Sequence, residues 1–339
     1  MRTAVIGSGA WGTALALALL KNGHETALWS YSEQESAFLR EKWENPMLPG
    51  VTLPEELVLT TDLDCAEGCG AVVLATPSFA VRSTARQLRD RLDPGTPVIL
   101  VSKGIERESS MLLHQVVEEE IGGFSPVVVL SGPSHAEEVA RGMPTAVVVA
   151  CENRPAAELA QDLFMSCCLR IYTSPDIVGV EVGAALKNVI ALCAGCCDGM
   201  GCGDNTKAML MTRGLTEIAR LGVALGARKE TFAGLAGVGD LIVTCTSMHS
   251  RNRRAGILIG QGRTVQEAIA ELGGAVVEGY YAAASAKKLA DRAGVEMPIT
   301  TGAYEVLYNG GNPRQVLARL MTRAKRDELD ALEVEESWI

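Results

Sequence analysis

Six residues near the amino terminus, Gly7-Ser8-Gly9-Ala10-Trp11-Gly12, most constrain what this chain can fold into. They follow an apolar, strand-like segment at 4–6 and precede an apolar, helix-like segment at 13–20. In such a unit the first glycine permits a tight turn and the second lets a ligand approach the backbone. The third lets the helix pack closely on the strand. The pattern predicts a turn that binds a dinucleotide at a helix N-terminus, with a glycine-rich turn without ligand as the alternative.

Short apolar runs recur through the first half of the chain and predict more strands. They lack polar alternation, as expected of buried parallel strands, and helix-like stretches at 11–20, 78–91 and 109–120 separate several of them. We therefore predict an α/β fold with a doubly wound, Rossmann-type parallel sheet. The predicted strands are 3–6, 26–30, 71–75, 97–102, 126–131 and 145–150, and 169–173 could close the sheet.

The strand pattern almost disappears after Ser174-Pro175-Asp176, and helical patterns continue to residue 331. A chain of 339 residues exceeds the length at which one core usually divides. We predict a dinucleotide-binding domain at 1–175 and an all-α, substrate-binding domain at 176–339. Ser174 or Asp176 could cap the first helix of the second domain.

The end of the second strand does not distinguish NAD from NADP. An acidic residue usually holds the adenosine ribose of NAD there, but this strand ends in Trp29-Ser30-Tyr31-Ser32. Glu33 and Glu35 come slightly late, and no Arg or Lys is near enough to indicate a 2′-phosphate. Both cofactors remain open.

Lys187 lies in the segment 178–192, which is apolar on nearly every side and predicts a helix buried all round. Burying an unpaired charge costs several kcal/mol, so such a lysine is a candidate proton donor to a carbonyl oxygen. Gly183 and Ala184, one turn earlier, would let a flat ligand lie against the helix. The alternative is a lysine whose charged end reaches water. Asn188 could bind substrate or be satisfied within the helix.

Two polar stretches of the second half could serve the same site. Ser250-Arg251-Asn252-Arg253-Arg254 could hold a phosphate, because Arg contacts phosphate through two hydrogen bonds, or it could be a solvated cluster. Asp240, among glycine and apolar neighbours, could pair with Lys187 or cap a helix. In the first half, Ser102-Lys103-Gly104 and Ser131-Gly132-Pro133-Ser134 follow two strands, at the sheet edge where ligands bind.

Composition excludes several classes of partner. Lys plus Arg number 31 and Asp plus Glu 41, a net charge of −10 that disfavours nucleic acid and anionic membranes. The apolar tract 177–197 contains Glu181, Lys187 and Asn188, which argues against a membrane span. A glycine motif beginning at Gly7 leaves no room for a secretory signal, so we expect a cytoplasmic protein.

The ten cysteines are expected to be reduced. Cys193, Cys196, Cys197 and Cys202 include one CxxC spacing, but neither a second CxxC nor a nearby His accompanies it. We predict no metal site.

An ordered set of motifs resembles the soluble, bacterial NAD(P)-dependent glycerol-3-phosphate dehydrogenase family over nearly the whole chain. The motifs are GSGAWG at 7–12, NPMLPGV at 45–51, SKG at 102–104, SGPSHAEE at 131–138, ALKNVIA at 185–191, GVGDL at 237–241, SRNRR at 250–254 and VVEG at 276–279.

This resemblance implies roles for individual residues. Lys187 would be the proton donor or acceptor, supported by Asp240, and Lys103 would bind substrate and cofactor. Substrate contacts would also come from Gly132, Ser134, Ser250, Arg251 and Asn252, and cofactor contacts from Ala10, Trp11, Ala136, Arg251, Val276 and Glu278. The local patterns described above add Gly7, Gly9, Gly12 and Tyr31 as predicted cofactor contacts and Asn188 as a predicted substrate contact. Tyr31 stands where the family often has a basic residue, which weakens a prediction of NADPH, and Ser134 replaces a frequent Thr.

The reaction implied is the reversible reduction of dihydroxyacetone phosphate to sn-glycerol 3-phosphate, for phospholipid synthesis, by a protein that could be a homodimer. A dehydrogenase of the β-hydroxyacid or phosphogluconate kind is one rival, although those usually separate the lysine and asparagine that are adjacent here. A non-catalytic NAD(P) sensor is the other.

Overall fold

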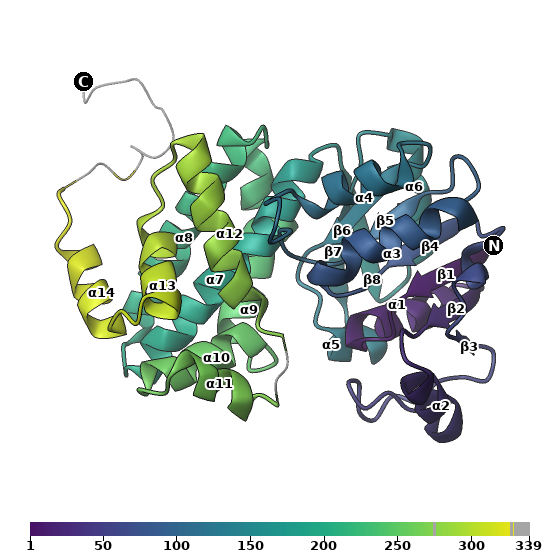
Figure 1. Ribbon diagram of the computed structural model, residues 1–339, viewed down its shortest axis with the longest axis horizontal. Helices are drawn as coiled ribbons and strands as arrows, with labels where there is room; N and C mark the ends of the chain where they lie inside the picture. Colours follow the sequence, from purple (N-terminus) through teal and green to yellow (C-terminus); the bar gives the residue numbers. More distant parts are fainter. Residues whose placement is uncertain (274–275, 326–327, 329–339) are drawn as a thin grey trace. The chain divides into compact units, whose positions relative to one another are not determined.

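The computed structural model describes residues 1–273, 276–325 and 328. Contacts within the chain define two compact units, Met1–Glu181 and Val182–Ile339 (Figure 1). Part of the predicted second domain, including the end of the helical pattern expected up to 331, lies outside the described residues.

The first unit is built on one eight-stranded sheet, ordered β3-β2-β1-β4-β5-β6-β7-β8. The chain order reverses between β1 and β4, the point at which doubly wound sheets bind ligands. The predicted sheet class is confirmed. The strands are β1 (Arg2–Ile6), β2 (Glu25–Trp29), β3 (Val58–Thr60), β4 (Ala71–Leu74), β5 (Val98–Leu100), β6 (Val127–Ser131), β7 (Thr145–Ala150) and β8 (Leu169–Ser174).

One prediction about the strands was wrong, and one strand was not predicted. β7 pairs with β6 antiparallel, whereas all other neighbouring strands are parallel. The only helix between β6 and β7 is α5 (Ala136–Ala140), whose five residues rise about 8 Å. That is too short to carry the chain back along β6 for a parallel return. The three residues of β3 were missed because so short a segment shows no clear periodicity.

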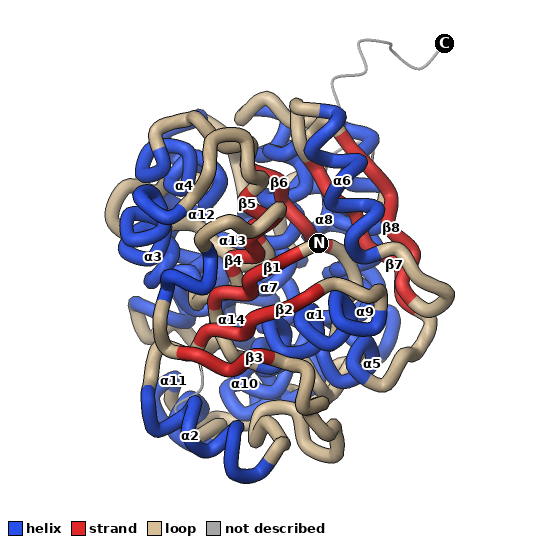
Figure 2. The backbone as a smooth tube through the Cα atoms, turned by 90° about the vertical axis from the view of Figure 1, so that its right-hand side faces the viewer, coloured by secondary structure: helices blue, strands red, loops and turns tan. Residues whose placement is uncertain are grey.

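Helices cover both faces of the sheet, with α3 and α4 on one side and α1, α5 and α6 on the other (Figure 2). The predicted helix at 109–120 starts only at Leu113, because Ser110 has a left-handed backbone with φ of 63°. The helices are α1 (Ala10–Lys21), α2 (Glu33–Lys42), α3 (Val81–Leu88), α4 (Leu113–Ile121) and α6 (Arg154–Phe164), with 3₁₀ turns η1 (Leu63–Ala66), η2 (Ser78–Ala80) and η3 (Arg89–Arg91).

From residue 177 onward the described residues form helices and no strand, as predicted. Asp176 accepts a hydrogen bond from the Gly179 N–H at 2.9 Å, which confirms it as a cap of α7. The elements are α7 (Ile177–Gly199), α8 (Asp204–Ala224), η4 (Lys229–Ala233), a π-helical turn η5 (Leu235–Gly239), α9 (Asp240–Thr246), α10 (Arg251–Gly260), α11 (Val265–Glu271), α12 (Glu278–Ala293), α13 (Pro298–Tyr308) and α14 (Pro313–Met321).

Helix α7 is the one described helix that is long and apolar enough, by length and composition, to cross a membrane. However, 89% of its most apolar window is buried within the protein. A core helix passes the same test, and Glu181, Lys187 and Asn188 are all buried along it.

Candidate active site

The three glycines of the amino-terminal turn face different surroundings. A Cβ on Gly7, whose φ is 127°, would lie 2.6 Å from the carbonyl oxygen of Ala75, and a Cβ on Gly12 would overlap the carbonyl oxygen of Gly7. A Cβ on Gly9 would meet no atom within 4 Å. The fold therefore requires Gly7 and Gly12, whereas Gly9 leaves open space beside the start of α1. A pyrophosphate could approach there.

Asn45, which the sequence presents only as the first residue of the motif NPMLPGV, fixes the position of the glycine turn. It is buried, and its Nδ2 donates to the carbonyl oxygen of Ser8 at 2.8 Å and to the Thr13 hydroxyl at 2.7 Å. Its Oδ1 accepts from the Met47 N–H at 2.9 Å. One amide thus ties the glycine turn to the first turn of α1.

The surroundings of β2 leave the end of the strand without a carboxylate positioned for a ribose. Glu33 accepts a hydrogen bond from the Thr61 hydroxyl, and Ser32 caps α2 through the Glu35 N–H. Tyr31 is 88% exposed, with its ring packed edge-to-face against Trp29. An exposed aromatic ring is a surface on which a base could stack.

Lys103, Gly132 and Ser134, predicted from two separate loops, come together. The Lys103 Nζ donates to the carbonyl oxygen of Gly132 at 3.1 Å and to the Ser134 Oγ at 3.3 Å. Ser134 donates to the same carbonyl oxygen at 2.9 Å. The partly exposed ammonium group is held by neutral oxygens at the ends of β5 and β6.

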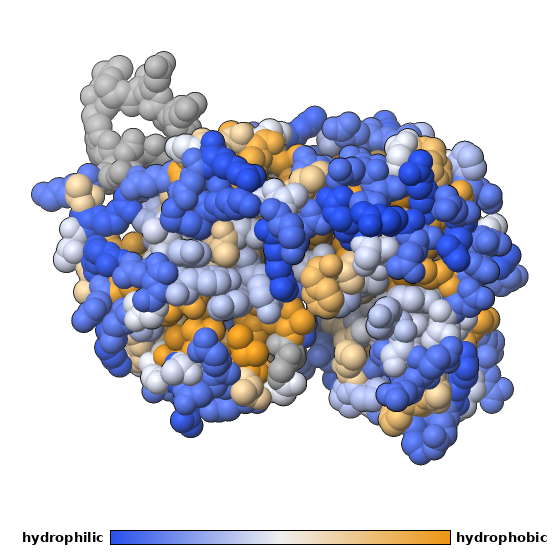
Figure 3. Space-filling view, viewed as in Figure 1, coloured by the Kyte–Doolittle hydropathy of each residue, from blue (hydrophilic) through white to orange (hydrophobic). Residues whose placement is uncertain are grey.

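A charged cluster under the Lys103 loop was missed by the sequence reasoning. Arg82 on α3 donates two hydrogen bonds to the buried carboxylate of Glu106, at 2.7 and 2.8 Å, and contacts Glu119 and Glu120 on α4. The Arg82 guanidinium lowers the pKa of Glu106. Because Arg82 and its partners lie on three separate stretches of the chain, no local pattern signals this cluster. The surface over α4 is mainly hydrophilic (Figure 3).

In the second unit Lys187 is buried, with only 6% of its surface exposed. Its Nζ forms an ion pair with Asp240, which is fully buried, and donates to the Thr244 hydroxyl at 2.9 Å. Thr244 donates to the Asp240 carbonyl oxygen at 2.6 Å. The predicted pair is confirmed, while Thr244, one turn after Asp240 on α9, was missed.

The expected space beside Gly183 is filled by the protein itself. A Cβ on Gly183 would lie 2.5 Å from the carbonyl oxygen of Ala236 in η5, and Ala184 is buried. The prediction of a flat ligand against this face of the helix was therefore wrong. Gly183 instead lets the π-helical turn that precedes Asp240 reach the backbone of α7, which brings the carboxylate to the lysine.

Asn188 and Asn252 join three helices. Asn252 donates through Nδ2 to the Asn188 Oδ1 at 3.0 Å and accepts through Oδ1 from the Gly279 N–H at 2.8 Å. Asn188 also donates to the carbonyl oxygen of Ala184 at 3.4 Å. Both amides are buried and fix the spacing of α7, α10 and α12.

The basic run 250–254 divides into structural and exposed members. Ser250 caps α10 by accepting from the Arg253 N–H at 3.2 Å, and Arg253 forms an ion pair with Asp198 at 2.7 Å. Arg251 and Arg254 are exposed. Of these two, Arg251 is the first residue of α10, where a phosphate at the helix N-terminus could meet its guanidinium group.

The remaining predicted cofactor residues lie at helix starts. Ala136 is the first residue of α5 and is buried against the core of the sheet domain. Glu278 begins α12, and Val276 lies half-buried two residues before it.

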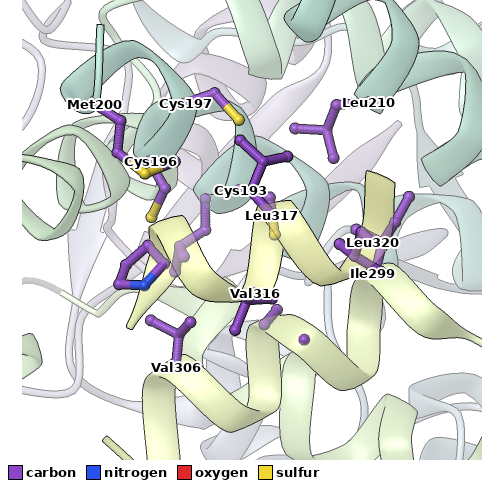
Figure 4. A pocket seen from close by; sticks show the side chains of 14 residues that line it. Cys193, Cys196, Cys197, Met200, Leu210, Ile299, Val306, Val316, Leu317 and Leu320 are labelled. Carbon is purple, nitrogen blue, oxygen red and sulfur yellow. The ribbon is translucent and has the colours of Figure 1, made fainter. Parts of the chain in front are cut away.

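The cysteines of α7 line an apolar cavity of about 60 Å³ (Figure 4). Figure 4 shows Cys193, Cys196 and Cys197 around it, with aliphatic side chains of α13 and α14 opposite. Burial raises the pKa of Cys196 and of Cys197 to about 12. Such thiols stay protonated, whereas metals bind thiolates. Among the described residues, no group of three or more His, Cys, Asp or Glu side chains could hold a metal.

A Rossmann-type sheet with an open glycine turn, together with a helical unit that buries a lysine–aspartate pair, defines the class of two-domain nicotinamide-dependent dehydrogenases. Comparisons with known proteins specify the family. The family model for the amino terminus of NAD-dependent glycerol-3-phosphate dehydrogenase matches residues 2–157, and that for its carboxyl terminus matches residues 176–318. The chain belongs to the NAD-dependent glycerol-3-phosphate dehydrogenase family.

Individual relatives agree along the whole chain. The chain is 54% identical to a glycerol-3-phosphate dehydrogenase (NAD(P)+) of Moorella thermoacetica, covering 97% of this chain and 98% of that one. It is 51% identical to that of Geobacillus kaustophilus, with 97% and 96% covered. A crystal structure of the Coxiella burnetii glycerol-3-phosphate dehydrogenase superposes with a TM-score of 0.91 at 37% identity, over 95% and 99% of the two chains.

Proposed function

We propose that this protein catalyses the reversible reduction of dihydroxyacetone phosphate to sn-glycerol 3-phosphate with NADH or NADPH, and that the product feeds glycerophospholipid synthesis. Family membership supports the reaction. The observation that carries the chemistry is the buried Lys187, paired with Asp240 and Thr244.

Reducing a ketone requires a proton at the oxygen that becomes a hydroxyl. Lys187 is assigned to that step, as acid in one direction and base in the other. Asp240 and Thr244 hold the ammonium group in one orientation. The bound nicotinamide cofactor supplies or accepts the hydride.

Substrate contacts are assigned to residues of each unit, taken separately. Arg251 at the start of α10 is assigned to the phosphate, with Ser250 and Asn252 shaping that helix end. Lys103, Gly132 and Ser134 are assigned to the substrate's oxygens, with Lys103 also at the cofactor. Asn188 is assigned a substrate contact, although its Oδ1 already accepts a hydrogen bond from Asn252.

The cofactor is assigned to the glycine turn and its surroundings. The open space at Gly9 fits a pyrophosphate, and the exposed Tyr31 ring fits an adenine. The proposed contacts are Gly7, Gly9, Ala10, Trp11, Gly12, Tyr31, Lys103, Ala136, Arg251, Val276 and Glu278.

We propose that residues 1–175 bind the dinucleotide and 176–339 the substrate, in a homodimer located in the cytoplasm. Sedimentation equilibrium tests the oligomeric state: a mass of one chain across the concentration range would exclude the dimer. Cell fractionation tests the location.

The decisive assay follows the absorbance of NADH and of NADPH separately while dihydroxyacetone phosphate is added. Turnover with either cofactor, lost in Lys187→Met, supports the proposal. Turnover of 6-phosphogluconate or 3-hydroxyisobutyrate instead would favour the β-hydroxyacid rival. Cofactor binding without turnover of any of these substrates would favour a sensor.

A further inference from the structure

Two adjacent cysteines stand apart from the other thiols of the chain. Cys167 and Cys168 lie in the turn between α6 and β8, where Cys167 is exposed and Cys168 half-buried. Their sulfur atoms are 3.6 Å apart. The pair is therefore a dithiol that a solvent-borne reagent can reach.

The turn holds this dithiol in one conformation. The Ser166 Oγ accepts hydrogen bonds from the Cys168 N–H at 3.3 Å and the Leu169 N–H at 3.0 Å. The carbonyl oxygen of Cys168 accepts from the Thr145 N–H at 2.8 Å, which ties the turn to β7. Because the backbone is already fixed, a ligand that bridges the sulfurs has little chain entropy to remove.

The sulfur spacing fits a bridging atom better than a disulfide. An atom bonded to two sulfurs at about 2.3 Å, with an angle near 100–110°, holds them roughly 3.5–3.8 Å apart. A disulfide needs sulfurs about 2.05 Å apart and usually Cα atoms about 4.4–6.8 Å apart. Consecutive Cα atoms are only about 3.8 Å apart across a trans peptide.

The donor set also limits which atom can bridge the pair. A tetrahedral zinc ion needs four ligands. No group of three or more His, Cys, Asp or Glu side chains lies together in the described part of the chain. Two thiols without further ligands suit a thiophilic centre of low coordination number.

We propose that Cys167 and Cys168 form a binding site for a trivalent arsenical. Two As–S bonds form as two S–H and two As–OH bonds break, and the thiol protons leave with the two hydroxide groups as two molecules of water. No oxidation state changes, so no oxidant or reductant takes part. The third valence of arsenic keeps its organic group or its hydroxide.

The other cysteines provide the contrast. Cys69, Cys151, Cys196, Cys197 and Cys245 are buried. Burial raises the pKa of Cys65 and of Cys245 to about 12. Cys197 and Cys202 also lie close together, but Cys197 is buried, so an arsenical would have to displace the packing around α7. These thiols are the matched controls.

The test uses the full, reduced chain and one equivalent of phenylarsine oxide, followed by native mass spectrometry. The parent chain is expected to gain one phenylarsenic group, with the loss of two protons from the protein. Cys167→Ser and Cys168→Ser should each lower the adduct at least tenfold, because one sulfur cannot form the bridge. Cys202→Ser and Cys65→Ser should retain it.

The proposal is overturned if the parent forms no adduct, or if the adduct survives in either Cys167→Ser or Cys168→Ser. Retention of the far-ultraviolet circular dichroism spectrum in each variant verifies that loss of the adduct is not loss of fold. The mass measurement does not involve turnover, so its outcome does not depend on whether the proposed reaction is correct.

Discussion

The two units hold their candidate catalytic lysines in opposite ways. Lys103, in the sheet domain, is partly exposed and donates to the neutral oxygens of Gly132 and Ser134. Lys187, in the helical domain, is buried and ion-paired with Asp240. A charge near water loses little hydration, whereas a buried one requires a counter-charge. The helical domain thus couples its chemistry to its stability more tightly than the sheet domain does.

Two carboxylates, one in each domain, differ in what shifts their pKa. In the sheet domain the guanidinium groups of Arg86 and Arg82 lower the pKa of Glu120 to about 2. In the helical domain burial raises the pKa of Glu217 to about 7, although the N–H groups of Ile299 and Thr300 donate to it at the start of α13. Partner charge sets the pKa shift of Glu120, and desolvation sets that of Glu217.

Lys187→Met should have the largest effect. Loss of the proposed proton donor should lower kcat by roughly 10²–10⁴-fold. The buried Asp240 left unpaired should lower the free energy of unfolding by about 3–5 kcal/mol. Steady-state kinetics and urea unfolding measure the two effects.

Lys103→Met is the comparison variant for stability, because the Lys103 side chain is only partly buried; we expect a change in unfolding free energy below about 1 kcal/mol. Adding Asp240→Asn to Lys187→Met should restore stability but not kcat. Equal destabilisation by the two single lysine variants would contradict the contrast between the domains.

Glu217 should make the helical domain less stable as pH rises. Its folded pKa of about 7 exceeds the usual 4.5, so its contribution is fully present below about pH 4.5 and is lost as pH rises through 7. The difference corresponds to roughly 3 kcal/mol. Urea unfolding at about pH 5 and pH 8 should show a smaller loss in Glu217→Gln than in the parent.

Glu120→Gln serves as the counterpart in the sheet domain. The lowered pKa of Glu120 means that its contribution is present above the usual pKa and is lost as pH falls through 2. This variant should leave the loss between pH 5 and pH 8 as in the parent. The same pH slope in Glu217→Gln and the parent would refute the assignment.

Within the glycine turn, Gly12→Ala and Gly9→Ala should separate fold from binding. A Cβ at Gly12 overlaps backbone, so unfolding free energy should fall by about 1–3 kcal/mol. A Cβ at Gly9 meets open space, so stability should change by less than about 0.5 kcal/mol. The Kd for the cofactor should instead rise about tenfold, some 1.4 kcal/mol. Cofactor titration by fluorescence would exclude a role for Gly9 if its variant bound normally.

Glu106→Gln should have the smallest effect. Weakening the Arg82 cluster loosens the loop that carries Lys103, so kcat/KM for dihydroxyacetone phosphate should fall roughly three- to tenfold. Glu119→Gln, which removes a different carboxylate from the same guanidinium, should leave kcat/KM unchanged. Similar losses of kcat/KM in both variants would show that the change in net charge, and not the loosened loop, causes the loss.

Local sequence patterns predicted much of the fold and part of the candidate site. The apolar runs located seven of the eight strands, and the burial of Lys187 followed from the apolar residues around it in one helix. Asn45, Arg82 and Thr244 escaped notice because each acts through partners distant in sequence or on another helix. Gly183 was misjudged because its neighbour in space is Ala236.

The sequence by itself determined the alternation of strands and helices, the glycine turn and the presence of a lysine that had to find a counter-charge. These features depend on periodicity and side-chain size over a few residues. Only the tertiary structure decided that β7 runs against β6 and that Asn252 bridges helices. It also left Arg251, rather than Arg253, exposed at the start of α10. Those outcomes depend on contacts between groups that are far apart in sequence, and tertiary packing determines those contacts.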